Sequence, residues 1–156
     1  LAFKGGDLFY EIRGIPMFFE DVRIVYGTPK VDFLEADGRS LRVAQVVRRN
    51  LRQNFPDAVS PTFIDTSGTP NRVSKMKREG RTGYSFAIRR ETDVTPFVVQ
   101  YPEGFRYREY ELLTGIRNAV GELDLEPVIF WHRSSLYVIN LWEPLPEAET
   151  AASAAN

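Results

Sequence analysis

Hydrophobic and polar residues alternate with a period of two in several short segments of the chain, and this pattern predicts β-strands. In residues 17–26, for example, Val22, Ile24 and Tyr26 fall on one side of an extended chain. The segments predicted as strands are 8–13, 17–26, 31–35, 84–88, 97–101, 127–132 and 136–142, with 59–64 as a further irregular candidate. Gly, Pro and Asp-Gly pairs between these segments supply the turns that a sheet of short strands needs.

Residues 41–55 show the 3.6-residue period of an amphipathic helix instead. Ser40 fits the N-cap position, and Pro56 ends the helix because proline cannot continue one. The apolar face is expected to consist of Leu41, Val43, Ala44, Val47, Leu51 and Phe55. The opposite face consists of Arg42, Gln45, Arg49, Arg52 and Gln53. Since surface helices usually mix charges of both signs to gain ion pairs one turn apart, a cationic face without any acid is unusual.

A second helix is predicted over residues 105–120, with an apolar stripe that includes Leu112 and Ile116. Gly121 fits its C′ position, where a left-handed backbone conformation commonly ends a helix. Between the two helices, residues 66–83 contain few apolar side chains and many Thr, Ser, Gly and basic residues. A connection of this length without regular structure is expected to be a mobile, functional loop.

These elements follow one another in the order β-β-β-α-loop-β-β-α-β-β. Strands that adjoin strands, with only two main helices between them, favour an α+β fold with a largely antiparallel sheet. A chain of 156 residues can bury one hydrophobic core, so residues 1–142 are predicted to form a single domain. Residues 143–156 are rich in Pro, Ala and Glu, and we expect them to form a flexible acidic tail.

The composition narrows the class of protein. A hydrophobic fraction of 43% argues against a disordered chain. The absence of cysteine excludes disulfides, thiol catalysis and cysteine-bound metals. No apolar run reaches the roughly 20 residues that a membrane-spanning helix needs, and no signal peptide is visible at the start. The sequence therefore predicts a soluble protein and leaves its compartment open.

The net charge of −1 conceals a basic middle between two acidic flanks. Residues 39–90 contain twelve Arg and Lys against three acids, which gives +9. The first 38 residues carry −3 and residues 91–156 carry −7. An asymmetry of this size bears on binding partners, and polyanions such as nucleic acids are the first to consider.

We therefore predict a non-enzymatic nucleic-acid-binding module that contacts the backbone phosphates of DNA or RNA. Its fixed part would be the cationic helix face, and its mobile part the basic loop. The candidate residues are Arg42, Arg49, Arg52, Arg72, Lys75, Lys77, Arg78 and Arg81. No cofactor or metal is assigned. Tyr84 and Phe86 follow the loop and could stack on bases, but their alternation is more typical of core residues.

Two alternatives remain open at this level. The basic middle can pair with the acidic flanks inside one fold, or it can bind acidic surfaces of neighbouring subunits. In the second case the protein would be a structural or assembly subunit of a multi-protein or viral particle, with protein partners or self-association. An enzyme is less well supported, because His132 is the only histidine and no catalytic spacing is recognisable.

Overall fold

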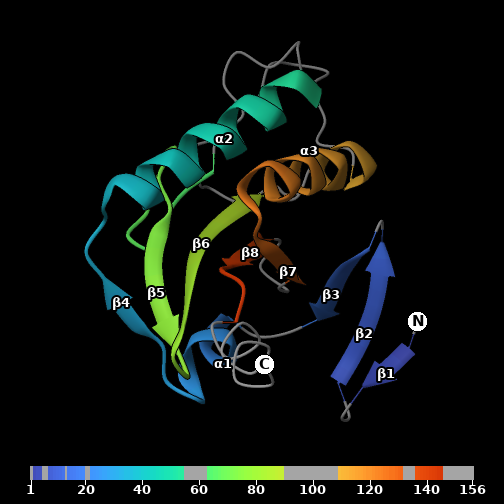
Figure 1. Cartoon of the computed structure of the whole chain (residues 1–156). Coiled ribbons are helices and arrows are strands. Elements are labelled where there is room, and N and C mark those ends of the chain that lie inside the picture. The colour runs from blue at the N-terminus through green and yellow to red at the C-terminus, as the bar shows by residue number, and fades with distance from the viewer. Residues whose placement is uncertain are drawn as a thin grey trace, which may run out of the picture.

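The computed structural model describes residues 2–4, 7–12, 14–19, 22–54, 63–89, 109–131 and 136–145. The strands within these residues are β1 (Ala2–Lys4), β2 (Asp7–Ile12), β3 (Ile15–Phe19), β4 (Asp32–Leu34), β5 (Ser74–Arg78), β6 (Arg81–Arg89), β7 (Glu126–Trp131) and β8 (Leu136–Trp142). The helices are α1 (Val22–Gly27), α2 (Gly38–Asn54) and α3 (Glu109–Leu123). All eight strands belong to one sheet, in the order β1-β2-β3-β7-β8-β6-β5-β4. The predicted α+β class is confirmed (Figure 1).

The sheet is largely antiparallel, as expected, but it is mixed, because one of its strand pairs is parallel. Neighbouring strands pair antiparallel except β3 and β7, which are parallel and bring Phe18 opposite Phe130. The two rings stack with their centroids 5.5 Å apart. Parallel neighbours need a long crossover between them, and the chain from β3 to β7 supplies it by passing through α2, β5, β6 and α3.

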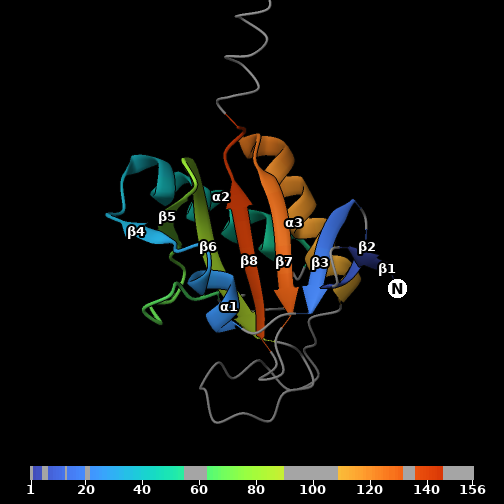
Figure 2. The same ribbon diagram turned by 90° about the horizontal axis from the view of Figure 1, so that it is seen from below.

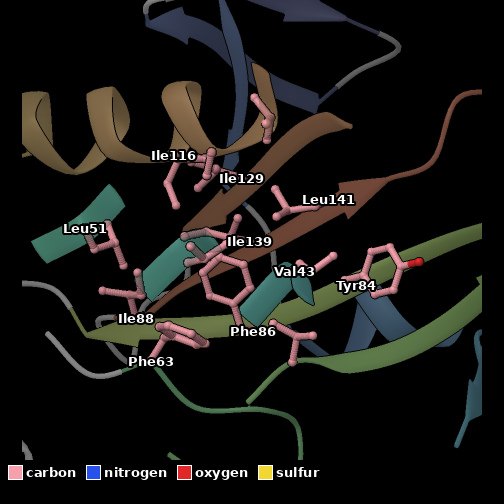
Figure 3. Close-up of a cluster of buried hydrophobic side chains, with 14 of the residues drawn as sticks. Val43, Leu51, Phe63, Tyr84, Phe86, Ile88, Ile116, Ile129, Ile139 and Leu141 are labelled. Carbon is pink, nitrogen blue, oxygen red and sulfur yellow. The ribbon is translucent and has the colours of Figure 1, made fainter. Parts of the chain in front are cut away.

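The helices cover the two faces of the sheet unequally. Helices α2 and α3 lie on one face, α2 over the β5–β6 side and α3 over the β7 side, while the short α1 lies on the opposite face (Figures 1 and 2). The main hydrophobic core fills the space between the sheet and the α2–α3 pair. Figure 3 shows Val43 and Leu51 of α2 and Ile116 of α3 meeting Phe86 of β6 and Ile139 of β8. This core fixes the position of α2, on which the candidate site depends.

Residues 22–26 are not the end of a strand, as the alternation predicted, but part of α1. A run of six residues fits both the strand and the helix period, and contacts outside the segment decide between them. Arg78 of β5 donates from Nη1 to the carbonyl of Val25 at 3.0 Å and from Nη2 to the carbonyl of Thr28 at 2.9 Å. These carbonyls lie at the end of α1, where a helix leaves its last acceptors without partners of its own.

The prediction of a loop over residues 66–83 is wrong from residue 74 onward, because β5 and β6 form a β-hairpin there. Glu79 and Gly80 reverse the chain with φ angles of 51° and 80°. Positive φ at both central residues is what a two-residue type I′ turn requires. Met76 is the only fully buried residue of β5. A strand with so little apolar content has almost no hydrophobic periodicity, so the pattern along the sequence does not reveal it.

Helix α2 is capped by Asp37 rather than by Ser40. The Asp37 carboxylate accepts the backbone N–H of Ser40 at 3.0 Å, and the Ser40 hydroxyl accepts the backbone N–H of Asp37 at 2.7 Å. This reciprocal pair is a capping box with serine at the third helical position. The helix therefore begins earlier than the predicted residue 41.

Helix α3 continues past Gly121 and ends at Leu123. Asp124 adopts the left-handed conformation at the C′ position, with φ 58°. The backbone N–H of Leu125 donates to the carbonyl of Val120 at 3.0 Å, which is the bond that defines a Schellman motif. The predicted end of this helix is corrected by three residues, because aspartate, like glycine, can adopt the left-handed conformation at the C′ position.

The strands predicted at 8–13, 31–35, 84–88, 127–132 and 136–142 correspond to β2, β4, β6, β7 and β8 and are confirmed. The predicted strand at 97–101, the start of the second helix, His132 and the tail from residue 146 lie outside the described residues. The assignment of the chain to a single domain stays a prediction.

Candidate nucleic-acid interface

Helix α2 buries one face and exposes the other on the outside of the molecule (Figure 1). Its buried residues are Ser40, Val43, Ala44, Val46, Val47, Asn50 and Leu51. At 100° per residue these occupy an arc of about 160°, which leaves the rest of the helix circumference to solvent. From Leu41 onward, the exposed residues of the helix are Leu41, Arg42, Gln45, Arg48, Arg49, Arg52 and Gln53. This set is called the α2 face below; it contains four arginines, two glutamines and no acid.

Helix α3 holds the α2 face in a fixed orientation. A Cβ atom on Gly115 of α3 would lie 3.1 Å from Cδ2 of Leu51 and 3.4 Å from the carbonyl oxygen of Asn50. The two helices therefore approach more closely than a larger side chain would allow. Asn50 is buried between them and donates to the Val46 carbonyl at 2.9 Å. A helix packed this tightly cannot rotate about its axis without disturbing the core.

Glu122 of α3 neutralises part of the α2 face. Its carboxylate forms an ion pair with Arg49 and lies 3.7 Å from Nη2 of Arg42. The hydrogen bond from Arg49 is the main reason that the pKa of Glu122 lies below its ordinary value. The side chains of Arg42 and Arg49 are still 53% and 47% exposed, so these pairs are open to water and to competing anions.

Arg48 and Arg52 form no ion pair with any residue that the structure describes. Together with Arg49 and Gln53 they line a shallow hollow on the C-terminal half of α2. Within the part of the chain that the structure describes, the α2 face therefore presents four cations against one carboxylate. Guanidinium groups in such a setting can each bind a phosphate oxygen pair in bidentate fashion.

The basic residues of the predicted loop are built into the β5–β6 hairpin, where several are used by the fold. Lys75 pairs with the α2 cap, its Nζ atom lying 2.5 Å from Oδ2 of Asp37. Arg78 donates hydrogen bonds to the backbone carbonyls of Val25 and Thr28 at the end of α1. The internal pairing that the sequence left open is thus confirmed for Lys75, with an acid from the N-terminal flank.

Arg81 is held by the C-terminal flank in the same way. Its Nε donates to the backbone carbonyl of Glu143 at 2.9 Å, and Nη2 forms an ion pair with Glu126. The guanidinium carbon also lies 5.8 Å from the centre of the Trp142 ring, within the range of a cation–π contact. An arginine with three such contacts is not a free phosphate ligand.

Arg72 and Lys77 are the two residues of the predicted basic loop that remain exposed without an ion pair among the described residues. Arg72 precedes β5 and borders a small hollow beside Phe33 and Leu34 of β4. Lys77 lies within β5, opposite Asp32 of β4. Both belong to the β4–β5 side of the sheet, and neither borders the hollow on α2.

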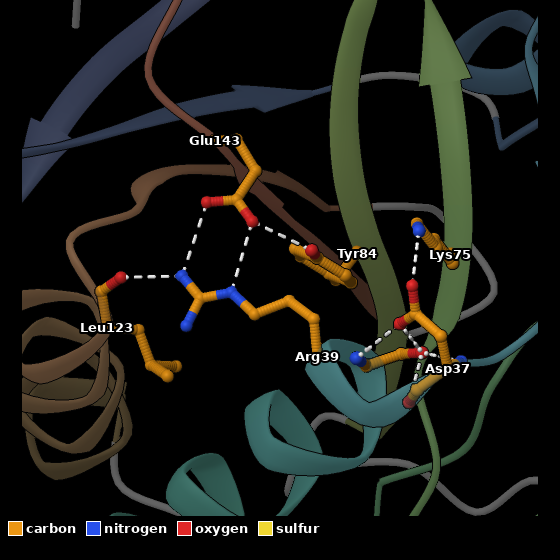
Figure 4. Close-up of polar contacts among 7 residues, drawn as sticks. Asp37, Arg39, Lys75, Tyr84, Leu123 and Glu143 are labelled. Carbon is orange, nitrogen blue, oxygen red and sulfur yellow. Dashed lines mark hydrogen bonds and ion pairs between the residues drawn. The ribbon is translucent and has the colours of Figure 1, made fainter.

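A partly buried ion pair links the start of α2 to the segment after β8 (Figure 4). Arg39 donates from Nε and Nη2 to the Glu143 carboxylate at 3.1 and 3.2 Å, and from Nη2 to the Leu123 carbonyl at 2.8 Å. The Tyr84 hydroxyl donates to Glu143 at 2.7 Å. Burial alone would raise the pKa of Glu143, but the hydrogen bonds from Arg39 and Tyr84 outweigh it and keep the pKa below its ordinary value. Burial and the Glu143 contact raise the pKa of Tyr84.

Tyr84 and Phe86 are 1% exposed and belong to the core, as their alternation in the sequence indicates. They do not form a stacking platform for bases. Within the described residues, no three His, Cys, Asp or Glu side chains lie close enough together to hold a metal ion. No helix in the same part of the chain is long and apolar enough to cross a membrane.

Sequence reasoning missed Arg48 as a member of the α2 face. The apolar stripe was drawn to include Leu41, which is 56% exposed, and it omitted Val46, which is fully buried. An arc centred on Val43 and Val47 would have placed Leu41 among the polar residues and Arg48 with the other arginines. The signal was present in the helical period.

No protein-family model matches the chain, and comparisons with curated protein sequences and with solved structures gave no match either.

Proposed function

We propose that the protein is a non-enzymatic nucleic-acid-binding module whose binding surface is the α2 face. The observation that supports this most directly is that, among the described residues, four exposed arginines on a rigid, outward-facing helix face only one carboxylate. Each arginine that contacts a phosphate releases condensed counterions, which adds affinity at low salt and makes binding salt-dependent. The chemistry of a guanidinium favours phosphate oxygens in particular.

The proposal changes the set of contact residues that the sequence suggested. Arg42, Arg49 and Arg52 stay in it, and Arg48 joins them. Arg72 and Lys77 remain candidates for additional phosphate contacts at the β4–β5 side. Lys75, Arg78 and Arg81 leave the set because their donors are already engaged within the chain.

The test is fluorescence anisotropy with labelled single-stranded and duplex oligonucleotides at several salt concentrations. The variant R48A/R52A removes the two α2 cations that have no ion pair among the described residues. Since each phosphate contact contributes about 0.9 to the slope of log K against log salt, the slope should fall by up to about 2 and affinity should fall at least roughly tenfold at low salt.

The matched control is the variant K30A/R117A, which removes the same charge elsewhere. Lys30 lies in the turn after α1. Arg117 is exposed on α3 and follows Gly115 by about 200° around the helix, on the side away from α2. Equal loss of binding in both variants would mean that only net charge matters. No binding of any nucleic acid at low salt would refute the proposed function.

A second candidate function, an assembly subunit, has one observation of its own. Strand β4 is an edge of the sheet, and its Phe33 and Leu34 are 49% and 41% exposed. Exposed apolar residues on an edge strand are a common site of pairing with another chain. Sedimentation velocity over a hundredfold range of protein concentration tests it, and a monomer throughout would count against this candidate.

A further inference from the structure

The residue types on the α2 face allow a more specific inference, which rests on the proposed function. Gln45 lies near the centre of the exposed arc, with Arg49 about 40° to one side and Arg52 about 20° to the other. Gln45 and Gln53 are exposed, and neither side-chain amide is hydrogen-bonded to a described residue. A surface that contacted only phosphates would need cations but would have no use for a free amide such as that of Gln45 at its centre.

We infer that α2 binds in the major groove of a DNA duplex and that Gln45 reads a base edge there. Gln45, Arg48, Arg49 and Arg52 occur at positions i, i+3, i+4 and i+7, so they project from one side of the helix. Three or four side chains of this kind are what a recognition helix presents to the bases. Glutamine pairs in bidentate fashion with adenine, and arginine with guanine, through atoms that only the major groove exposes fully.

The dimensions of α2 agree with those of the groove. From Gln45 to Arg52 the helix rises about 10 Å, which corresponds to about three base pairs. The major groove of B-form DNA is about 12 Å wide and admits a helix with its side chains. Duplex RNA is excluded as the partner, because its major groove is too deep and narrow for side chains to read.

The remaining arginines are placed to contact the DNA backbone. Arg42 and Arg48 lie about 60° to either side of Gln45, near opposite margins of the α2 face. A helix inserted along a groove brings residues at its two margins toward the phosphates of the two strands. The α2 face thus combines central base-reading groups with flanking phosphate ligands. The close packing of α2 against α3 holds this arrangement rigid before DNA binds.

The experiment begins with selection of binding sequences from a random duplex library by the full chain. Anisotropy titrations then compare the selected duplex, a scrambled duplex and the corresponding single strand. We expect the selected duplex to bind about 5- to 100-fold more tightly than the scrambled one, the range of one or a few base-reading contacts. The variant Q45A should lose most of this preference while its salt slope stays unchanged, because phosphate contacts are left intact.

Each other outcome has a defined meaning. Duplex binding without sequence preference, or preference unchanged in Q45A, overturns base reading by Gln45 and leaves the proposed function standing. Tighter binding of the single strand overturns the major-groove arrangement and also leaves the proposed function standing. Absence of binding to any nucleic acid at low salt overturns both. Circular dichroism of Q45A verifies that α2 is intact, since Gln45 is exposed and alanine favours helix.

Discussion

The α2 face and the β5–β6 hairpin are both rich in basic residues, but the fold uses these residues differently. In the hairpin, Lys75 and Arg81 pair with acids, and Arg78 bonds to backbone carbonyls. On α2, Arg48 and Arg52 have no ion pair among the described residues, and Arg42 and Arg49 share a single exposed glutamate. One basic region holds the structure together, and the other remains available to a ligand.

The comparison teaches that the net charge of a segment does not locate a binding surface. The acids that neutralise the hairpin are Asp37 and Glu126, which lie 38 and 45 residues away along the chain from Lys75 and Arg81. Arg81 also uses the backbone carbonyl of Glu143, so even an uncharged group consumes its donors. What matters for function is whether an arginine has unused donors that face solvent.

The largest difference between the two regions should appear in stability. The variants R78M and R81M keep the length of the side chain but remove its donors. We expect the free energy of unfolding to fall by about 1–3 kcal/mol for R78M, because two carbonyls at the end of α1 lose their partner. Urea denaturation followed by circular dichroism measures this change.

The matched variants are R48M and R52M on α2. Exposed substitutions away from structural contacts usually change stability by less than about 0.5 kcal/mol. If R48M cost as much stability as R78M, the distinction between a structural and a free basic region would be wrong. The same four proteins should show the opposite ranking in nucleic-acid binding.

The sequence was informative where local pattern decides structure. The α2 helix, the β7–β8 hairpin and the α+β class follow from period and turn residues alone. The sequence was not informative where a contact with a distant residue determines the local structure. Gly83 lies within β6, for instance, because a Cβ atom there would come within 2.5 Å of the Trp142 ring. The residues near Gly83 in the sequence do not predict this contact with Trp142.

The candidate site was predictable in part for the same reason. Arg42, Arg49 and Arg52 lie on one exposed face of α2, as the helical period indicates. The sequence does not separate Arg78 and Arg81 from them, because the partners of these two arginines lie on α1, β7 and the segment after β8. Tertiary pairing is invisible to composition, so a basic segment can be divided into used and unused charges only in three dimensions.

The second difference should appear at acid pH, because the hairpin region depends on carboxylates. The hydrogen bond from Lys75 is the main cause that lowers the pKa of Asp37 well below its ordinary value, and the pKa of Glu143 is lowered as well. A folded-state pKa below the unfolded value of about 4 gives stability that is fully present above about pH 5 and is lost progressively as pH falls further. The free energy of unfolding should therefore decline below about pH 5 in wild type and less steeply in D37N/E143Q.

The control for this measurement is D32N/E35Q, which removes two exposed acids that form no ion pair with described residues. Its decline with falling pH should resemble that of wild type. Denaturation curves at intervals between pH 7 and pH 2.5 give the comparison. Equal slopes for wild type and D37N/E143Q would show that these carboxylates do not stabilise the folded state.

The smallest effect concerns Glu122, the acid that pairs with the α2 face among the residues that the structure describes. Its carboxylate must be displaced from Arg42 and Arg49 before a phosphate can take its place. In the variant E122Q that competition is removed, and affinity for nucleic acid should rise roughly two- to fivefold at low salt, as expected for exposed ion pairs. The gain should shrink as salt rises, because screening weakens the original pairs as well.

Glu126 provides the matched comparison, since it pairs with Arg81 of the hairpin. If E126Q raised affinity as much as E122Q, the hairpin arginine would be available to nucleic acid after all, and the two basic regions would differ in degree rather than in role.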